Sequence, residues 1–271
     1  MNQISSPAPL PPLGPTQMLR RRDPVVAIVG ATGAVGAELI ACLERRGFAH
    51  SGLRLLASAR SAGKTLQAGG RAVEVQELTE AAFEGVDLAL FSAGAARSRQ
   101  FAPAAVRAGA IVVDNSSAFR MDPEVPLVVP EINAAALAGH SGIIANPNCA
   151  AIIAGLAMYP LHRANPLTRA VVTTYQAASG GGAAMMAELV DSTRAYLAGE
   201  SFTPQVLAVD YAFNLFSHNT AVDPQTLYND EETKLAQETR KIFGAPALAI
   251  AATCIRVPVL RAHSIALNLS F

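Results

Sequence analysis

The segment 146–149, Asn-Pro-Asn-Cys, places a cysteine, Cys149, directly before a helical pattern over Ala150–His162. The first turn of a helix has unpaired backbone N–H groups and carries the positive end of the helix dipole, and both favour a thiolate over a thiol. Thiolate is the form of cysteine that attacks acyl carbons. The competing interpretation is a small buried cysteine in an alanine-rich core. This segment alone leaves both interpretations open.

A glycine-rich turn near the N-terminus has the pattern of a phosphate-binding loop. Val25–Val29 is apolar and β-branched, which is typical of a buried parallel strand, and Ala37–Arg46 has helical spacing with Gly47 as its stop. Glycines spaced G-x-x-G-x-x-G let the backbone approach a pyrophosphate, while the helix N-terminus supplies N–H groups. The alternative is a tight turn without a ligand, but strand and helix lie where a nucleotide site needs them. The candidate loop consists of Gly30, Ala31, Thr32, Gly33, Ala34, Val35 and Gly36.

The residues after the second strand-like run, Leu53–Ala57, indicate which nucleotide would bind. An NAD site usually has an acidic side chain here for the ribose 2′-hydroxyl. Residues 58–64 contain hydroxyls and cations but no acid, and this composition suits the 2′-phosphate of NADP. An ordinary solvated loop is the alternative. The candidates for this contact are Ser58, Arg60 and Ser61.

Alternating strand and helix patterns complete the first half. Val86–Phe91 and Ala110–Asp114 are strand-like and are separated by a helical stretch over Arg97–Ala108. Such alternation predicts a doubly wound parallel sheet with right-handed crossovers. The turn after the third strand lies at the carboxyl edge of this sheet, so Ser92 and Gly94 join the cofactor candidates.

The pattern changes after Cys149. A longer strand-like run over Arg169–Ala178 precedes a helix over Ala183–Leu197, and a second helix runs from Asp230 to near Gly244. The last stretch, 248–271, is rich in strand signals. Strands gathered near the end indicate a mixed or antiparallel sheet in an α+β domain.

Bulk composition limits the classes of partner. The chain has 271 residues, which is enough for two domains; it is 51% apolar and has a formal net charge of zero. This argues against nucleic-acid and anionic-membrane partners, and no apolar run reaches the ~18–20 residues of a membrane span. The three cysteines, Cys42, Cys149 and Cys254, are far apart and fit thiols in a reducing cytoplasm rather than a disulfide framework or a metal site.

The N-terminal segment is proline-rich and ends in three arginines and an aspartate. It has no apolar core of a secretory signal, so residues 1–23 are predicted to be a disordered tail. Met18 is an alternative start.

Several motifs together resemble aspartate-semialdehyde dehydrogenases. They are the glycine loop and the segments 114–120, 146–149, 174–180 and 256–263. They follow the family order from about Val25 to the chain end, and several motifs at coherent spacing are far more specific than one. The resemblance implies an α/β protein with a Rossmann-like NADP-binding domain over 24–148, then an α+β catalytic and dimerisation domain with a mixed sheet over 149–271. It also implies a homodimer.

The chemistry implied is the NADPH-dependent reductive dephosphorylation of L-aspartyl 4-phosphate to L-aspartate 4-semialdehyde and phosphate. This step leads toward lysine, threonine and methionine. Cys149 would attack the acyl phosphate to form a thioester, His263 would act as acid/base, and Gln176 would orient the substrate. The alternatives are a half-buried strand histidine and a structural glutamine.

The resemblance also assigns binding residues. Arg256 would hold the substrate carboxylate, Arg120 would receive the leaving phosphate, and Lys234 would assist it. Glu231 would hold the ammonium group, although the neighbouring Glu232 leaves the register open. A solvated surface role is the alternative for each of these charged residues. Ser179 and Gly180 complete the implied cofactor contacts.

Two rival interpretations remain open. N-acetyl-glutamyl-phosphate reductase shares this chemistry but has its cysteine in a His-Pro-Gly-Cys setting; glyceraldehyde-phosphate dehydrogenase is disfavoured because its Ser-Cys-Thr-Thr-Asn setting is absent. The second rival is a truncated, catalytically incompetent family member, because the sequence stops eight residues after His263 while family members continue. We therefore expect an incomplete second domain with an uncovered strand edge.

Overall fold

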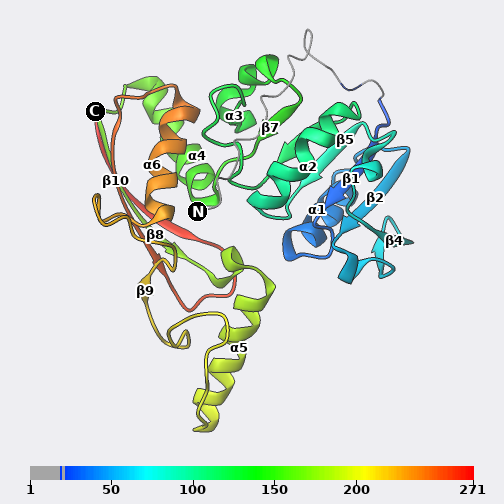
Figure 1. Ribbon diagram of the computed structural model, residues 1–271. Helices are drawn as coiled ribbons and strands as arrows, with labels where there is room; N and C mark the ends of the chain where they lie inside the picture. Colours follow the sequence, from blue (N-terminus) through cyan, green and yellow to red (C-terminus); the bar gives the residue numbers. More distant parts are fainter. Residues whose placement is uncertain (1–18, 20–21) are drawn as a thin grey trace, which may run out of the picture. The chain divides into compact units, whose positions relative to one another are not determined.

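The computed structural model describes residue 19 and residues 22–271 (Figure 1). The predicted tail and the alternative start at Met18 lie almost wholly outside the described residues. The described chain forms two compact units. The first contains the residues up to Ala31, Ile40–Pro126 and Ala136–Ala145; the second contains Thr32–Leu39, Leu127–Ala135 and Asn146–Phe271. The division into functional domains between residues 148 and 149 stays a prediction.

The first unit is built on a seven-stranded sheet with the order β3-β4-β2-β1-β5-β6-β7. Every neighbouring pair is parallel except β3 and β4, which form an antiparallel hairpin. The predicted doubly wound parallel sheet is therefore confirmed. The bounds are β1 Val25–Val29, β2 Gly52–Ala57, β3 Thr65–Ala68, β4 Arg71–Glu77, β5 Leu88–Phe91, β6 Ile111–Asp114 and β7 Ile143–Ala145.

Three of these strands were missed by the sequence analysis. The β3–β4 hairpin turns through Gly69 and Gly70, both with positive φ, which is the pattern of a two-residue hairpin turn. Strand β7 has only three residues and is too short to show a period. The missed strands extend the sheet at its two ends and leave its centre as predicted.

The centre of this sheet is apolar because helices cover both of its faces. Residues 26–29 of β1 are fully buried. Helix α1, Ala34–Arg45, follows β1, and α2, Ala95–Arg107, follows β5. The strand order runs one way from β1 to β2 and the other way from β5 to β6, so right-handed crossovers place α1 and α2 on opposite faces. Helix α1 begins three residues before its predicted start, inside the glycine loop.

The second unit contains a four-stranded mixed sheet with the order β11-β8-β10-β9. The central strands β8, Arg169–Gln176, and β10, Ala249–Arg256, are parallel, whereas β9, Phe216–Ser217, and β11, Ser264–Ser270, are antiparallel to their neighbours. The prediction of a mixed sheet is confirmed.

Two helices lie over one face of this second sheet, α4, Cys149–Ala164, and α6, Asp230–Phe243 (Figure 1). Alternate residues of β8 and β10 point into the core beneath them, where Val172 and Ala252 meet Met158 and Leu235. The core fixes α4 and α6 on the sheet, and with them the side chains at their N-termini.

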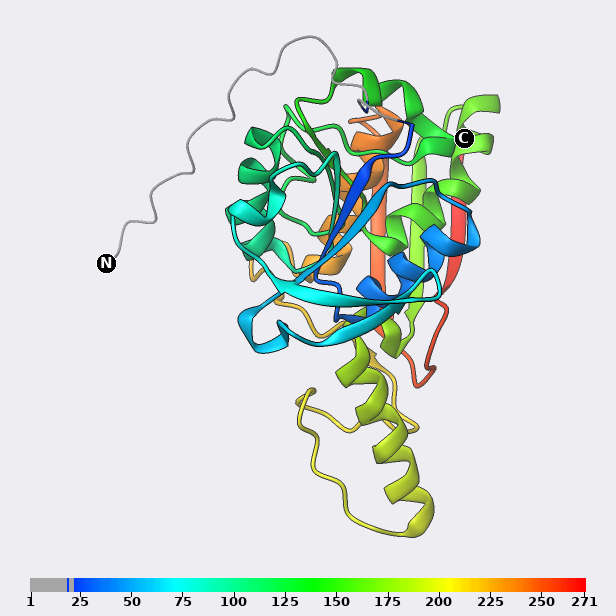
Figure 2. The same cartoon turned by 90° about the vertical axis from the view of Figure 1, so that its right-hand side faces the viewer.

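A helical arm extends from the second unit. Helix α5, Ala183–Ala198, points away from the sheet of this unit in both views (Figures 1 and 2). The buried carboxylate of Glu188 accepts the backbone N–H groups of Gln205, Val206 and Leu207 at 2.6, 2.6 and 3.0 Å, which holds the return segment against the helix.

Short helical segments complete the described chain. They are α3 Pro130–Asn133, and the 3₁₀ turns η1 Ala59–Ser61, η2 Ala81–Phe83, η3 Ala134–Gly139 and η4 Ala178–Gly181. None of the helices in residues 19 and 22–271 combines the length and apolar character needed to cross a bilayer.

Gly30 is predicted to be irreplaceable in the first unit. Its φ is +90°, and a Cβ built on it would lie 2.5 Å from the carbonyl oxygen of Ser92. We expect Gly30→Ala to lower the free energy of unfolding by about 2–3 kcal/mol, from backbone strain and overpacking. Denaturant unfolding measures this. Gly139→Ala is the matched control, because a Cβ there meets nothing within 4 Å. Equal stability of the two variants would contradict the prediction.

Candidate functional site

Cys149 is the first residue of α4, which begins one residue before its predicted start, and it is exposed. The preceding residue, Asn148, is the N-cap: its Oδ1 accepts the backbone N–H groups of Ala150 at 2.8 Å and Ala151 at 3.3 Å. These bonds fix the start of the helix at the cysteine. The sulfur therefore lies at the positive end of the helix dipole, where a thiolate is favoured.

A buried carboxylate, Glu231, joins three elements of the second unit. Its Oε1 accepts a hydrogen bond from Asn148 Nδ2 at 2.8 Å and from Gln176 Nε2 at 3.0 Å. Asn148 precedes α4, Gln176 ends β8, and Glu231 lies in the first turn of α6. Its Oε2 makes no hydrogen bond within the described residues, so this oxygen is available to a ligand.

The charge state of Glu231 depends on its partners. Burial would raise the pKa of this carboxyl, but hydrogen bonds from Gln176 and Asn148 and the nearby charges of His218 and Lys234 bring the pKa below its ordinary value. Glu231 is thus an anion at neutral pH, as a site for an ammonium group requires.

Glu232 has a different, structural role. It forms a capping box with Asn229 at the start of α6, with both hydrogen bonds at 2.9 Å, and it accepts the backbone N–H of Cys254 at 2.9 Å. The sequence left open which of the two acids belongs to the candidate site. In the structure Glu231 contacts Asn148 and Gln176, whereas Glu232 binds the backbone of β10.

Arg256 is held at the end of β10 with part of its guanidinium available. It is 4% exposed; its Nε donates to Asn219 Oδ1 and its Nη1 to the carbonyl oxygen of Ala177, both at 3.1 Å. Nη2 makes no hydrogen bond within the described chain. The end of the fork therefore remains for a carboxylate, and the guanidinium interacts electrostatically with Cys149.

His263 lies beside Arg256. Its Nδ1 accepts the backbone N–H of Ala177 at 3.0 Å. Burial lowers the pKa of His263, the charge of Arg256 lowers it further, and Glu231 acts in the opposite direction. A Cβ on Gly180 would lie 3.0 Å from Arg256 Nη1 and 3.3 Å from His263 Nε2. Both side chains therefore pack closely against the Cα of Gly180, and a larger residue there would collide with them.

The sequence analysis missed a second histidine, His218, in the same cluster. It is 6% exposed, and its Nδ1 lies 3.3 Å from Thr220 Oγ1. Burial and the cationic neighbours Arg256 and Lys234 lower the pKa of His218 to about 4, against an opposing effect of Glu231. His218 follows a two-residue strand in a segment without periodicity, so nothing in the local sequence marks it.

Glu238 and Asn219 were also missed. Glu238 is 1% exposed on α6, and one of its carboxylate oxygens accepts the backbone N–H of Asn148 at 2.6 Å. It lies two helical turns beyond Glu231, on the same side of α6. A spacing of seven residues between two acids on a predicted helix could have indicated this shared face.

The two candidates for binding a phosphate, Lys234 and Arg120, belong to different units. Lys234 is on α6, one turn after Glu231, and interacts electrostatically with Glu231 and His218. Arg120 belongs to the first unit, is 8% exposed, and donates to the carbonyl oxygen of Asn115 at 2.9 Å. The role of Arg120 toward a phosphate stays a prediction.

The glycine loop follows β1 at the point where the strand order reverses. Ligands of doubly wound sheets bind at such a switch point, beyond the carboxyl ends of the strands. Gly30 approaches the backbone of Ser92 after β5, and Gly94, with φ +87°, is the N-cap of α2. Loop residues 31–33 lead into α1, and residues 34–36 form its first turn.

The other cofactor candidates lie in two places. Ser58, Arg60 and Ser61 follow β2, the neighbour of β1; Arg60 is exposed, whereas Ser61 is buried. Ser179 and Gly180 lie in η4 of the second unit. Their part in binding a nucleotide stays a prediction.

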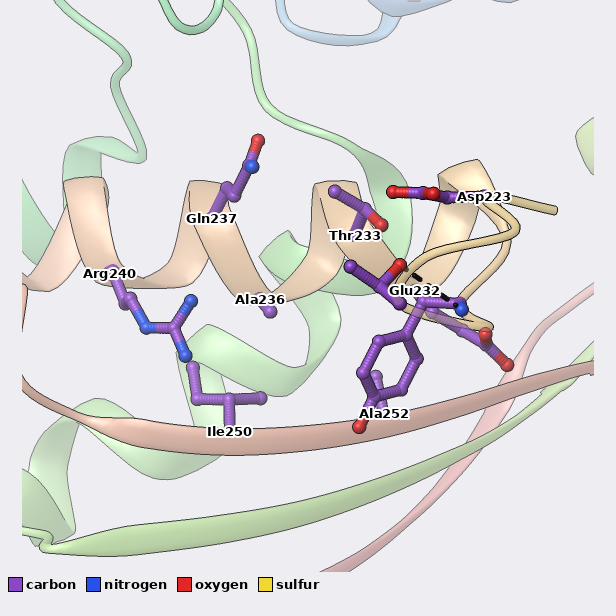
Figure 3. Close-up of a pocket in the computed structure, with 10 residues that line it drawn as sticks. Asp223, Glu232, Thr233, Ala236, Gln237, Arg240, Ile250 and Ala252 are labelled. Atoms are coloured by element: carbon purple, nitrogen blue, oxygen red, sulfur yellow. Dashed lines mark hydrogen bonds between the residues drawn. The ribbon is translucent and has the colours of Figure 1, made fainter. Parts of the chain in front are cut away.

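A separate cavity of about 250 Å³ lies on another side of α6 (Figure 3). Glu232, Thr233, Ala236 and Gln237 line it from the helix, with Ile250 and Ala252 on β10 below. It shares no residue with the cluster of Cys149, Gln176, Glu231 and His263, so it is distinct from the candidate active site.

Asn148 is predicted to stabilise the start of α4 through Oδ1 and to hold Glu231 through Nδ2. Asn148→Ala removes both the cap and the hydrogen bond to Glu231, and we expect a loss of about 1–2 kcal/mol in the free energy of unfolding. Asn148→Ser, the matched variant, keeps a capping oxygen and should recover roughly half of that loss. Denaturant unfolding measures both. If serine were no better than alanine, the capping role would be refuted.

His218 is predicted to make stability depend on pH. The unfolded side chain takes a proton near pH 6.5, but the folded one does so only near pH 4. The stabilisation is therefore complete above pH 6.5 and is lost as the pH falls toward 4, by about 3 kcal/mol in total. Unfolding measured between pH 7 and pH 4 should give a flatter curve for His218→Gln than for the exposed control His50→Gln. Parallel curves would contradict this.

The family of the chain is shown by comparison with known proteins. Residues 25–140 match the family described as "Semialdehyde dehydrogenase, NAD binding domain", and residues 158–271 match "Semialdehyde dehydrogenase, dimerisation domain". The aspartate-semialdehyde dehydrogenase of Synechocystis sp. is 54% identical over 246 residues, which cover 91% of this chain and 72% of the relative. The Bacillus subtilis enzyme of the same name is 46% identical and covers 88% and 71%.

Solved structures agree in fold. The crystal structure of aspartate semialdehyde dehydrogenase II from Vibrio cholerae is 42% identical, with a TM-score of 0.89. The match covers 91% of this chain and 74% of the Vibrio cholerae chain. A second structure of that enzyme is described as complexed with ASA, at 41% identity, a TM-score of 0.89 and coverage of 92% and 74%. With matching sequence and fold over both units, this chain belongs to the aspartate-semialdehyde dehydrogenase family.

Proposed function

We propose that this chain catalyses the NADPH-dependent reductive dephosphorylation of L-aspartyl 4-phosphate to L-aspartate 4-semialdehyde, through a thioester on Cys149. The observation that carries this is the contact between Glu231 and Asn148. This hydrogen bond joins an anion suited to an ammonium group to Asn148, the residue directly before the helix-terminal cysteine. The ASA described in the Vibrio cholerae relative supports a ligand of this class.

The proposed substrate fits the charges of the site. Its α-carboxylate would bind the open end of the Arg256 fork, and its α-ammonium group would bind Glu231 Oε2. Gln176 already donates to Glu231, so it would orient the same end of the substrate. Lys234 and Arg120 are the proposed partners of the phosphate.

The chemistry starts at Cys149. Its thiolate would attack the acyl carbon, an oxyanion would form, and phosphate would leave as the thioester forms. His263 is the proposed acid/base group of this step. Asn148 and Glu238 act as positioning residues, because they hold the turn that carries the cysteine.

The residues after β1 fit a bound nucleotide. Gly30 lets the loop pack against the backbone of Ser92, and α1 begins with N–H groups at Ala34. Arg60 after β2, together with the absence of an acid there, favours NADP. When bound, this cofactor would supply the hydride that reduces the thioester to the aldehyde.

An N-acylated substrate fits less well. It would bring no positive charge to Oε2 of Glu231, and an acyl group beside this oxygen would remove water from it without a compensating hydrogen bond or charge. The buried anion therefore favours the free amino acid phosphate over N-acetyl-glutamyl phosphate.

Assembly and location belong to the same proposal. The match of residues 158–271 to a dimerisation domain supports a homodimer. A cytoplasmic location and a place in lysine, threonine and methionine biosynthesis stay predictions.

Acylation can be tested without reduction. The purified chain, mixed with L-aspartyl 4-phosphate in the absence of NADPH, should release one equivalent of phosphate and gain an acyl adduct on Cys149, seen by mass spectrometry. Cys149→Ser should lose this burst by at least about 10³-fold, since the hydroxyl has no comparable activation. Cys42→Ser is the matched control. A faster burst with N-acetyl-glutamyl phosphate, or an unimpaired serine variant, would refute the proposal.

A further inference from the structure

We infer that the cavity between α6 and β10 binds a small zwitterion, a linear ω-amino acid with about five methylene groups between its ammonium group and its carboxylate. The cavity has a volume of about 250 Å³, and its lining residues all lie between positions 223 and 252, within the second unit (Figure 3). Because it shares no residue with the candidate active site, the inference does not depend on the proposed function.

The size of the cavity suits a small metabolite. An apolar cavity of about 150 Å³ holds benzene, which has six heavy atoms, so a cavity of about 250 Å³ accommodates roughly ten. A six-carbon ω-amino acid, such as 6-aminohexanoate, has nine heavy atoms and carries one charge at each end of its chain. It therefore fits the space by volume.

One end of the cavity presents a guanidinium with unused donors. Arg240 is half-buried, and its Nε donates to the carbonyl oxygen of Leu248 at 2.9 Å, which holds the side chain across the start of β10. Neither Nη1 nor Nη2 makes a hydrogen bond or an ion pair within the described residues. Figure 3 shows this guanidinium turned toward Ile250, at the floor of the cavity. The free edge of the guanidinium suits a carboxylate.

The other end of the cavity is negatively charged. Asp223 and Glu232 line it, and Figure 3 places both at the opposite end from Arg240. Each carboxylate oxygen of Glu232 already accepts a backbone N–H group, so this side chain contributes charge rather than a free acceptor. Asp223 is exposed, and hydrogen bonds from Gln225 and Thr226 lower the pKa of its carboxyl, so it is an anion at neutral pH. This end suits an ammonium group.

The separation of the two ends agrees with the length of such a ligand. Glu232 and Arg240 are about two turns apart on α6, or roughly 12 Å along the helix axis. An extended six-carbon ω-amino acid is as long as two residues of extended chain, about 7 Å, and a hydrogen bond of about 3 Å at each end gives a span of about 13 Å. One molecule of this length therefore reaches both ends.

The wall between the two ends is apolar. Ala236 lines the cavity from α6, and Ile250 and Ala252 line it from β10 (Figure 3). Methylene groups of a ligand would be buried against these side chains. A fatty acid would leave Asp223 without a cation, and an alkylamine would leave Arg240 without an anion. The charge pattern therefore favours a zwitterion over either of these simpler molecules.

Binding can be observed at the apolar wall. The full chain, labelled with ¹³C in the methyl groups of alanine and isoleucine, is titrated with 6-aminohexanoate. We expect the methyl resonances of Ala236, Ile250 and Ala252 to shift with a Kd of about 1 mM, as two partly exposed ion pairs and a short buried chain would give. If none of these resonances shifted at about twenty times that concentration, the inference would be overturned.

Three related molecules test whether both charges and their separation are needed. Hexanoate lacks the cation, hexylammonium lacks the anion, and 3-aminopropanoate carries both charges on a chain that is too short. We expect each to bind about three- to tenfold more weakly than 6-aminohexanoate. Equal affinity for any one of the three would overturn the choice of a zwitterion of this length.

Variants of the lining residues test the position of the ligand. Arg240→Gln and Asp223→Asn each remove one charge and keep a polar side chain, and each should raise the Kd about three- to fivefold. Ala236→Leu fills the cavity and should abolish binding, with denaturant unfolding used to check that the variant is folded. Arg163→Gln, at an exposed position of α4, is the matched control and should leave the Kd unchanged. Unchanged binding in Arg240→Gln and in Ala236→Leu would place the ligand elsewhere and overturn the inference.

Discussion

The candidate site depends on the hydrogen bonds that meet at one buried oxygen, Oε1 of Glu231. Asn148 and Gln176 both donate to it, so the start of α4, the end of β8 and the first turn of α6 are joined at a single atom. A buried carboxylate is stable only when its charge is compensated by such donors. The same requirement fixes the amide of Asn148, whose other atom caps the helix at Cys149. Moving one of these elements would therefore disturb the cysteine and the carboxylate together.

Around this centre, several polar side chains are held by hydrogen bonds through some of their atoms and keep another polar atom without a protein partner. Arg256 is fixed through Nε and Nη1 and keeps the end of its fork; Glu231 is fixed through Oε1 and keeps Oε2; His263 is fixed through Nδ1 and keeps Nε2. Side chains held in this way lose little entropy when a ligand binds, which is what preorganisation requires. Burial and the nearby cations lower the pKa values of His218 and His263, so both rings are uncharged at neutral pH.

The two adjacent acids at the start of α6 show how a helix serves two purposes. Successive residues on a helix point about 100° apart, so Glu231 faces Asn148 and Gln176 while Glu232 turns to β10 and the cavity on its other side. The capping box made by Glu232 stabilises the turn on which Glu231 stands. Two neighbouring carboxylates therefore have different partners: Glu232 stabilises the start of α6, and Glu231 belongs to the candidate site.

The sequence by itself determined the order of most elements and indicated which residues are candidates for the chemistry. Apolar runs and helical spacing located β1, α2, α4, β8 and α6 within a few residues, because these patterns follow from local periods of burial. They also placed Cys149 at a helix start, and the sheet types followed from the alternation of elements. The partners of Glu231, the backbone contact of His263 and the presence of His218 in the cluster were decided only by the tertiary structure. Each depends on contacts between residues 55 to 86 positions apart, or on a segment without periodicity, and no local pattern specifies which distant atom a buried polar group will meet.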